Sequence, residues 1–239
     1  SGIVSAEGRQ LFSLGTVMQI DAAVNNGNSG GPIIDEFGNV QAIVFAGMLE
    51  YQGLNFAIPV EYLKILIPRL YYGGEITHPF VGAYGKSFKD KGVEVLWVQN
   101  SSPAKYAGLK EGCIITKING TKINSINDLH FTQMSLLSKS IIEYTIIDES
   151  GTEKEILVLS DVRKEYPGYD FYKKSSVANS IYPLFGMKSK NVSSFFGNKY
   201  IVDSVVKGSI ADESGFSELD PVKIYRTYLS PDEDILFAE

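Results

Sequence analysis

The stretch NNGNSGGPII, residues 25–34, decides how the first part of this chain is interpreted. A serine that performs acyl transfer needs a hydroxyl on a tight turn, two backbone N–H groups directed at the developing oxyanion, and small neighbours. Ser29 supplies the hydroxyl and one N–H, Gly27 can supply the second N–H, and Gly30 and Gly31 leave room for a substrate carbonyl. Taken alone, GNSGG fits a glycine-rich β-turn with an incidental serine equally well.

The composition excludes several classes of function. The 239 residues are 44% hydrophobic and 21% charged, which is typical of a globular chain. The net charge of -6 leaves no basic stripe for phosphates, so we expect no nucleic-acid partner. A single cysteine, Cys113, excludes an intrachain disulfide and a cysteine-based metal cluster. No apolar run reaches the roughly 18 residues of a membrane helix, and we expect neither a metal nor a cofactor.

Short β-segments separated by Gly, Asn and Asp turns fill residues 1–57, a pattern that predicts an antiparallel barrel or sandwich. The chain opens directly on strand-like residues, so we expect it to begin inside a domain. A helix should follow, with Pro59 in its first turn and Gly73–Gly74 at its end. Helical spacing predicts that one face of this helix is buried, namely Val60, Leu63, Ile67 and Leu70.

The remainder of the chain contains an internal repeat. HPFVGA (78–83) corresponds to YPLFGM (182–187), and SSPAKYAGLKEGCII (101–115) corresponds to GSIADESGFSELDPV (208–222). A third block, VEVLWVQN, corresponds to KYIVDSVV, and the three blocks occur in the same order in both copies. The second copy should lack the helix and hairpin of the first, so we expect it to be incomplete.

The flanks of the serine turn resemble a known family. QIDAAVNNGNSGGPII, GNVQAIVFAG and LNFAIPVEYL, with the opening GIVSAEGR, are similar to the second half of the protease domain of HtrA (Deg, Do-like) proteins. This resemblance implies a mainly β chain with α+β modules: the second-barrel part of a chymotrypsin-like (trypsin-like) domain, followed by PDZ domains. The expected divisions are the protease part at 1–75, a first PDZ domain at 76–162, a linker at 163–180 and an incomplete second PDZ domain at 181–239.

The resemblance also implies roles for individual residues. Ser29 would be the nucleophile, and the oxyanion hole would comprise Gly27, Asn28 and Ser29. Ala23, six residues before the nucleophile, would form the floor of the specificity pocket and favour a small or medium aliphatic side chain. Phe45 and Ala46 would form the substrate-pairing strand edge and the wall of that pocket.

A general base for Ser29 is missing from the sequence. His78 and His130 both fall in the first PDZ-like unit, and Asp21 matches the family's DAA strand, which is not the position of the triad aspartate. Without a base, a serine hydroxyl stays a poor nucleophile at neutral pH. We therefore expect the 239 residues alone to lack useful protease activity.

PDZ domains bind the end of a peptide by strand addition beside a helix, with a backbone loop around the terminal carboxylate. The family's loop pattern fits Phe80-Val81-Gly82-Ala83 and Leu184-Phe185-Gly186-Met187. A helix capped by Ser125 or Asn127 should face the first loop. Its apolar positions are Ile126, Leu129, Met134 and Leu137, of which one or two should line the pocket, with Leu129 and Met134 as candidates.

The favoured interpretation is a serine-type endopeptidase of protein quality control. Family resemblance implies unfolded polypeptides and peptide C-termini as partners, a homo-oligomer based on trimers, and the periplasm or cell envelope of a bacterium. The alternative is a catalytically silent, PDZ-type peptide-binding module or chaperone-like adaptor.

Overall fold

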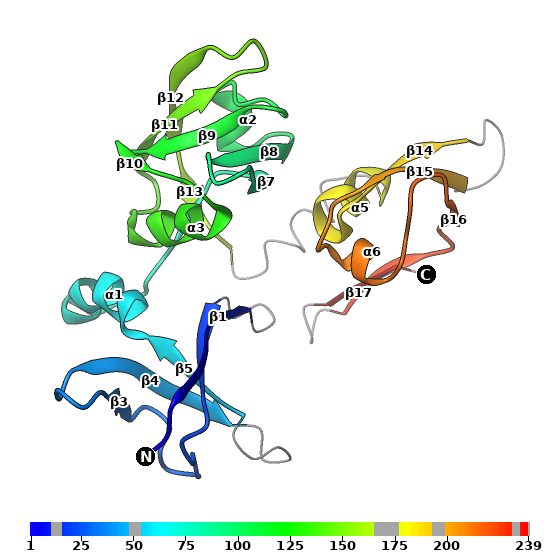
Figure 1. Cartoon of the computed structure of the whole chain (residues 1–239). Coiled ribbons are helices and arrows are strands. Elements are labelled where there is room, and N and C mark those ends of the chain that lie inside the picture. The colour runs from blue at the N-terminus through cyan, green and yellow to red at the C-terminus, as the bar shows by residue number, and fades with distance from the viewer. Residues whose placement is uncertain (11–15, 48–53, 165–176, 193–198, 231–234, 239) are drawn as a thin grey trace. The chain divides into compact units, whose positions relative to one another are not determined.

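The computed structural model describes residues 1–10, 16–47, 54–164, 177–192, 199–230 and 235–238. The chain divides into two units, Ser1–Ile76 and Thr77–Glu239 (Figure 1).

The first unit contains one antiparallel sheet of five strands, which confirms the β-rich prediction for this region. The strand order is β1-β2-β5-β4-β3. The bounds are β1 (Val4–Gln10), β2 (Thr16–Ile20), β3 (Pro32–Ile34), β4 (Val40–Gly47) and β5 (Asn55–Pro59). The central strands supply a small apolar core of Met18, Ile20, Ala42 and Ala57, against which Ala22, Val24 and Ile33 pack. This core fixes the strands on either side of the segment that carries Ser29.

Helix α1 (Val60–Tyr72) follows β5 directly, at the position predicted from Pro59 and Gly73. The expectation of a buried face was wrong, because α1 has no buried residue. Ile67 is 42% exposed and Leu70 is 58% exposed. The spacing of apolar residues is helical as predicted, but the described strands of this unit do not cover the helix.

The first module of the second unit is built on a six-stranded antiparallel sheet. The strand order is β12-β11-β9-β8-β7, and β10 pairs with β9. The bounds are β7 (Ala83–Ser87), β8 (Val93–Val98), β9 (Ile114–Ile118), β10 (Thr121–Lys122), β11 (Ile141–Ile147) and β12 (Glu153–Leu159). A separate ribbon joins β6 (Pro79–Phe80) to β13 (Asp161–Val162). Strand β7 therefore lies at the edge of the sheet, where an added strand can pair with it.

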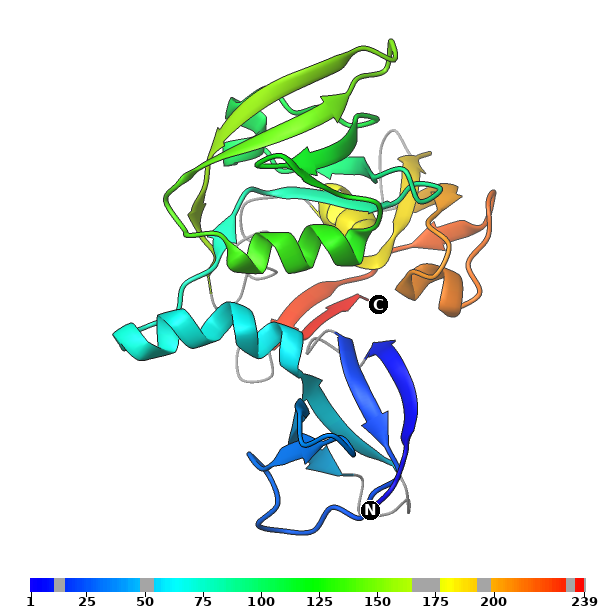
Figure 2. The same cartoon turned by 60° about the vertical axis from the view of Figure 1, so that its left-hand side comes forward.

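Two helices complete this module (Figure 2). The short α2 (Pro103–Tyr106) is capped by Ser102, whose side chain accepts from the N–H of Lys105. Helix α3 (Ile126–Ser135) begins with a capping box in which Ser125 and Asp128 accept from each other's backbone N–H. The prediction of Ser125 as a cap is thus confirmed. The N–H of Ile126 also donates to Ser87 Oγ at 2.9 Å, which ties the start of α3 to the end of β7.

The first module is built around one hydrophobic core. The buried residues come from strands β8, β9, β11 and β12, from both helices and from the connecting loops, and include Val93, Val95, Ala104, Leu109, Cys113, Ile115, Ile118, Leu129, Ile142, Tyr144 and Val158. Cys113 is 3% exposed and packs as a small hydrophobic residue, as predicted.

The second module repeats the beginning of the first, which confirms the internal repeat. It comprises α5 (Val177–Phe185), β14 (Met187–Asn191), β15 (Lys199–Val205), α6 (Ile210–Glu213) and β16 (Pro221–Lys223), with the strands in the order β14-β15-β16. The N–H of Leu109 donates to Ala104 O, and its counterpart Phe216 donates to Ala211 O, both at 3.0 Å. Ser209 caps α6 as Ser102 caps α2. The same hydrogen bonds thus recur at corresponding positions.

The two modules differ after the third strand of the repeat. The second module continues into a hairpin of β17 (Thr227–Ser230) and β18 (Ile235–Ala238), which forms its own two-stranded sheet. The sequence predicted no hairpin here, so this detail was wrong. Most of the predicted linker, 163–180, falls at residues 165–176, outside the described residues, and its last four residues open α5.

Candidate active site and peptide groove

Ser29 lies on a turn held by backbone hydrogen bonds on both sides. Asn28 N donates to Asn25 O at 3.0 Å, and Gly31 N donates to Asn28 O at 3.0 Å. The segment then pairs with β4, because Gly30 N donates to Val44 O at 2.7 Å and Val44 N donates to Gly31 O at 3.0 Å. The Ser29 side chain is exposed. The turn therefore presents its hydroxyl to solvent from a fixed backbone.

The glycines of this turn are required by its geometry. Gly27 has φ of +99°, which an L side chain rarely adopts. A Cβ on Gly31 would lie 2.9 Å from Asn28 O, too close for an ordinary contact. The conformation of the turn therefore depends on glycine at both positions.

The backbone N–H groups of Gly27 and Ser29 donate to no acceptor in the described part of the chain. Both groups belong to the turn that carries the exposed hydroxyl. They are therefore available to an oxygen that approaches Ser29, as an oxyanion hole requires. Asn28 lies between them, and its own N–H is used to close the turn.

No histidine occurs among residues 1–76, because His78 and His130 both fall in the second unit. Asp21 has a structural role: its carboxylate accepts from Ile3 N at 2.7 Å, and its own N–H donates to Ile3 O at 3.3 Å. These bonds fasten the N-terminal residues beside the end of β2. The first unit thus carries a candidate nucleophile and candidate oxyanion donors, and its residues include no histidine.

The residues assigned to the specificity pocket lie on segments that flank the serine turn. Ala23 is exposed, and its neighbour Ala22 is held by a hydrogen bond from the buried Asn55 Nδ2 to Ala22 O at 2.8 Å. Phe45 and Ala46 are half-buried on β4, directly after the residue that pairs with the serine segment. A register shift between Val44 and Ala46 leaves Phe45 as the extra residue of a bulge.

The first module carries the second candidate site, at the loop Phe80-Val81-Gly82-Ala83. Ala104 N donates to Val81 O and Gln99 N donates to Gly82 O, both at 2.8 Å. The two carbonyls are thereby fixed within the module. The N–H groups of Val81 and Gly82 donate to no described acceptor. A loop with bonded carbonyls and available N–H groups is a suitable nest for an anion.

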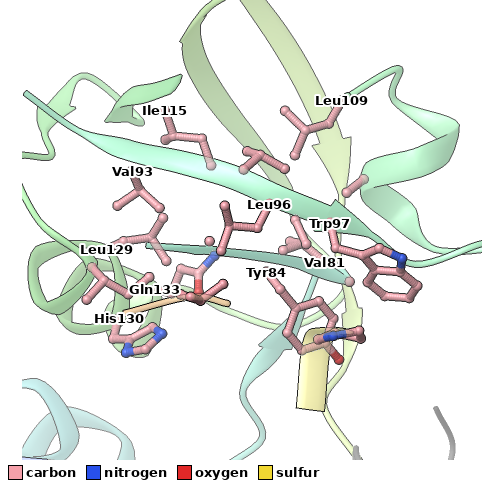
Figure 3. Close-up of a pocket in the computed structure, with 18 of the residues that line it drawn as sticks. Val81, Tyr84, Val93, Leu96, Trp97, Leu109, Ile115, Leu129, His130 and Gln133 are labelled. Atoms are coloured by element: carbon pink, nitrogen blue, oxygen red, sulfur yellow. The ribbon is translucent and has the colours of Figure 1, made fainter. Parts of the chain in front are cut away.

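Helix α3 forms the wall opposite strand β7, and an apolar groove lies between them (Figure 3). Residues of the second module, from the segments 182–186 and 206–210, also line this cavity. Ile126, Leu129, His130 and Gln133 line the groove from the helix, and Val81, Ala83 and Tyr84 line it from the loop and strand. Leu129 therefore lies where the sequence placed it. Met134 does not line the groove. It follows Gln133, the last lining residue of α3, and successive residues of a helix point about a quarter of a turn apart. Leu137 follows the end of α3 and is 65% exposed.

Two polar residues of α3 were missed by the sequence reasoning, which considered apolar positions only. Gln133 Nε2 donates to the hydroxyl of Tyr144 at 2.9 Å, and burial raises the pKa of Tyr144 to about 12. The Tyr144 hydroxyl thus stays protonated in the floor of the groove. His130 is exposed at one side, yet desolvation by its neighbours lowers its pKa, and the charge of Arg163 lowers it further.

The loop of the second module has the same fold with a different hydrogen-bond pattern. Val206 N donates to Gly186 O at 2.8 Å, as Gln99 does to Gly82 O. Helix α5, however, runs directly into this loop, and Gly186 N donates to Tyr182 O at 2.8 Å. The helix therefore uses an N–H that the first loop leaves available. Leu184, Phe185 and Met187 flank Gly186 as the repeat predicted.

No helix in the described residues is long and apolar enough to cross a membrane. Within the same residues, no group of three or more His, Cys, Asp or Glu side chains could hold a metal ion.

Three family models match successive parts of the chain. The model described as Trypsin matches residues 6–67, the model described as PDZ domain matches residues 75–146, and the model described as TP0546 family PDZ domain matches residues 168–239.

Relatives with similar sequences are named as proteases. "Protease Do-like 1, chloroplastic" of Arabidopsis thaliana is 33% identical over 158 residues, which cover 54% of this chain and 36% of that protein. "Serine protease Do-like HtrA" of Lactobacillus helveticus is 31% identical over 54% of this chain and 38% of that protein. "Probable periplasmic serine endoprotease DegP-like" of Brucella suis biovar 1 is 35% identical over 54% of this chain and 28% of that protein. The chain thus spans less than half the length of these relatives.

Solved structures show the same fold. "HtrA-type protease AlgW with tripeptide" has a TM-score of 0.57 at 24% identity, covering 68% of this chain and 60% of that chain. "HtrA-type protease AlgW with decapeptide" has a TM-score of 0.54 at 24% identity, covering 68% of this chain and 55% of that chain. The resemblance predicted from the sequence is confirmed: this chain contains trypsin-like sequence followed by two PDZ domains, and its homologues are HtrA- and DegP-type serine proteases.

Proposed function

We propose that the full-length protein is a serine endopeptidase in which Ser29 attacks a peptide carbonyl. The observation that carries this proposal is the exposed Ser29 hydroxyl on a turn whose Gly27 and Ser29 N–H groups are available. A base supplied from outside the first unit would take the hydroxyl proton as the Oγ–carbon bond forms. Collapse of the tetrahedral intermediate breaks the C–N bond and releases the amine with a proton, and water then hydrolyses the acyl-enzyme.

The substrate preference follows from Ala23, Phe45 and Ala46. These residues offer no carboxylate as counter-ion for a basic side chain. A small or medium aliphatic side chain before the cleaved bond suits an uncharged pocket of this kind. The proposed substrates are unfolded polypeptides, since pairing with a strand edge requires an extended chain.

The groove between β7 and α3 is proposed to bind peptide chain ends. Available N–H groups at Val81 and Gly82 suit a terminal carboxylate, and the apolar wall around Leu129 suits an aliphatic side chain. The peptides named with the AlgW structures were bound to proteins of the same fold. The name of the Brucella relative supports the periplasm as the place of action, and family resemblance supports a trimer-based oligomer.

A fluorophosphonate probe tests the catalytic proposal. The full-length protein should be labelled rapidly and degrade unfolded casein, and its Ser29→Ala variant should do neither. The 239-residue chain should label slowly, because without a triad member only about 10³- to 10⁴-fold catalysis over water remains. Rapid labelling of the 239-residue chain at Ser29 would show that the base lies within it. Absence of labelling in the full-length protein would contradict the proposal.

The second candidate is a peptide-binding module without catalysis. The apolar groove beside β7 and the available N–H groups of Val81 and Gly82 support this candidate, since peptide binding there needs no catalytic serine. The two candidates separate on the same experiment, because only the protease loses casein degradation when Ser29 becomes alanine.

A further inference from the structure

The groove of the first module has an uneven distribution of charge. Its described lining is mostly apolar and contains no aspartate or glutamate. Arg163 is the one ionised side chain among these lining residues. A groove with this lining is electrostatically suited to an anionic group and unsuited to a cation.

Backbone pairing holds Arg163 close to the start of the loop Phe80-Val81-Gly82-Ala83. Strand β13 pairs with β6, with Asp161 opposite Phe80 and Val162 opposite Pro79. Arg163 N then donates to His78 O at 2.7 Å. The residue is therefore fixed next to the segment that leads into Phe80, although the two are more than eighty positions apart in the sequence.

The charge of Arg163 acts on both walls of the groove. On the strand side, burial raises the pKa of Tyr84, and Arg163 opposes this by favouring the phenolate. On the helix side, burial lowers the pKa of His130, and Arg163 lowers it further. Both effects favour the neutral imidazole of His130. This leaves Arg163 as the cation that a ligand between the two walls would meet.

We propose that Arg163 binds a carboxylate of the peptide seated in the first groove, adding a full charge to the Val81 and Gly82 N–H groups. The proposal rests on the proposed peptide binding by this groove. The carboxylate could be the C-terminus of the peptide or an acidic side chain near it. Both have the same chemistry, and a guanidinium can donate two parallel hydrogen bonds to either carboxylate.

The experiment measures binding of labelled peptides to the 239-residue chain by fluorescence anisotropy. A decapeptide with a C-terminal valine is prepared in four forms, with a free or amidated C-terminus and with Glu or Gln as the penultimate residue. Each is titrated with the wild-type chain, Arg163→Gln, Arg163→Lys and Lys164→Gln. Lys164 is the matched control because it is the adjacent exposed cation and does not line the groove.

Arg163→Gln should weaken binding of the free-acid Glu peptide about 3- to 5-fold at low salt, the range expected for a solvent-accessible ion pair. The loss should shrink at about 0.5 M salt, where the charges are screened. Arg163→Lys should retain part of the affinity, and Lys164→Gln should bind as the wild type does. If amidation alone removes the Arg163 effect, the partner is the terminal carboxylate, and if Gln alone removes it, the partner is the side chain.

Equal affinities of the wild type and Arg163→Gln for all four peptides would overturn the inference. An equal loss in Lys164→Gln would also overturn it, because the effect would then be one of general charge. Thermal unfolding of each variant checks that Arg163→Gln is folded, and Arg163→Lys keeps the test valid if it is not. A wild-type chain that bound no free-acid peptide would contradict the proposed peptide binding itself, and this outcome differs from a failure confined to Arg163.

Discussion

Replacing Gly82 by alanine should destabilise the first PDZ domain and weaken its binding of peptides. Gly82 has φ of +76° and lies against Ser102, the cap of α2. An alanine Cβ would lie 2.4 Å from Ser102 Cβ and 2.9 Å from Ser102 Oγ. Ser102 is fully buried at 0% exposure, so it has no space into which to move. The loop would have to shift, taking its N–H groups with it.

The cost has two parts that a matched control can separate. A left-handed backbone with a Cβ costs about 1–2 kcal/mol, and overpacking of a buried contact costs about 1–3 kcal/mol more. Gly120 also has φ of +76°, but nothing lies within 4 Å of the Cβ it would gain. Gly120→Ala should therefore lose only the first part, about 1–2 kcal/mol. The difference between the two variants measures the contact with Ser102.

Urea unfolding followed by tryptophan fluorescence measures both variants, because Trp97 on β8 is the single tryptophan of the sequence. It reports on the first PDZ domain rather than on the other parts of the chain. Gly82→Ala should show a lower midpoint than Gly120→Ala and a weaker affinity for the free-acid peptide. Equal losses of stability in the two variants would refute the reasoning, since the space around Ser102 would then accept a methyl group at no cost.

Two further predictions concern hydrogen bonds that position the candidate sites. Backbone N–H groups of Asn124 and Ser125 lower the pKa of Asp128, so its contribution to stability is present above the ordinary aspartate pKa and is lost as the pH falls below about 3.9. Asp128→Asn should cost about 0.3–1 kcal/mol at pH 7 and progressively less as the pH falls from about 4 toward the lowered pKa of Asp128, measured by Trp97 fluorescence; a deficit that does not shrink with falling pH would contradict this assignment. Asn55→Ala removes the bond to Ala22 O and should destabilise the first unit by about 1–3 kcal/mol, seen as faster hydrogen exchange in β2 and β5, with the exposed Asn26→Ala as a control that should leave exchange unchanged.

The serine turn could be predicted from the sequence in considerable detail because its requirements are local. Gly27 needs its positive φ and Gly31 needs the absence of a Cβ, and both are properties of residues within the turn itself. The internal repeat was equally accessible, because Ser102 and Ser209 cap short helices at matching positions. The exposure of α1 was not accessible, because helical spacing shows which face is apolar and says nothing about what covers it.

The sequence by itself determined the order of trypsin-like and PDZ segments, the glycine-rich turn around Ser29 and the loops around Gly82 and Gly186, since each rests on neighbouring residues. Only the tertiary structure decided which side chains meet in the groove. Arg163 belongs to the groove because β13 pairs with β6, whereas the sequence assigned it to a linker. The second loop differs from the first because α5 brings the Tyr182 carbonyl to Gly186 N. Strand pairing and helix packing join residues far apart in the chain, and a local pattern cannot report the contacts that result.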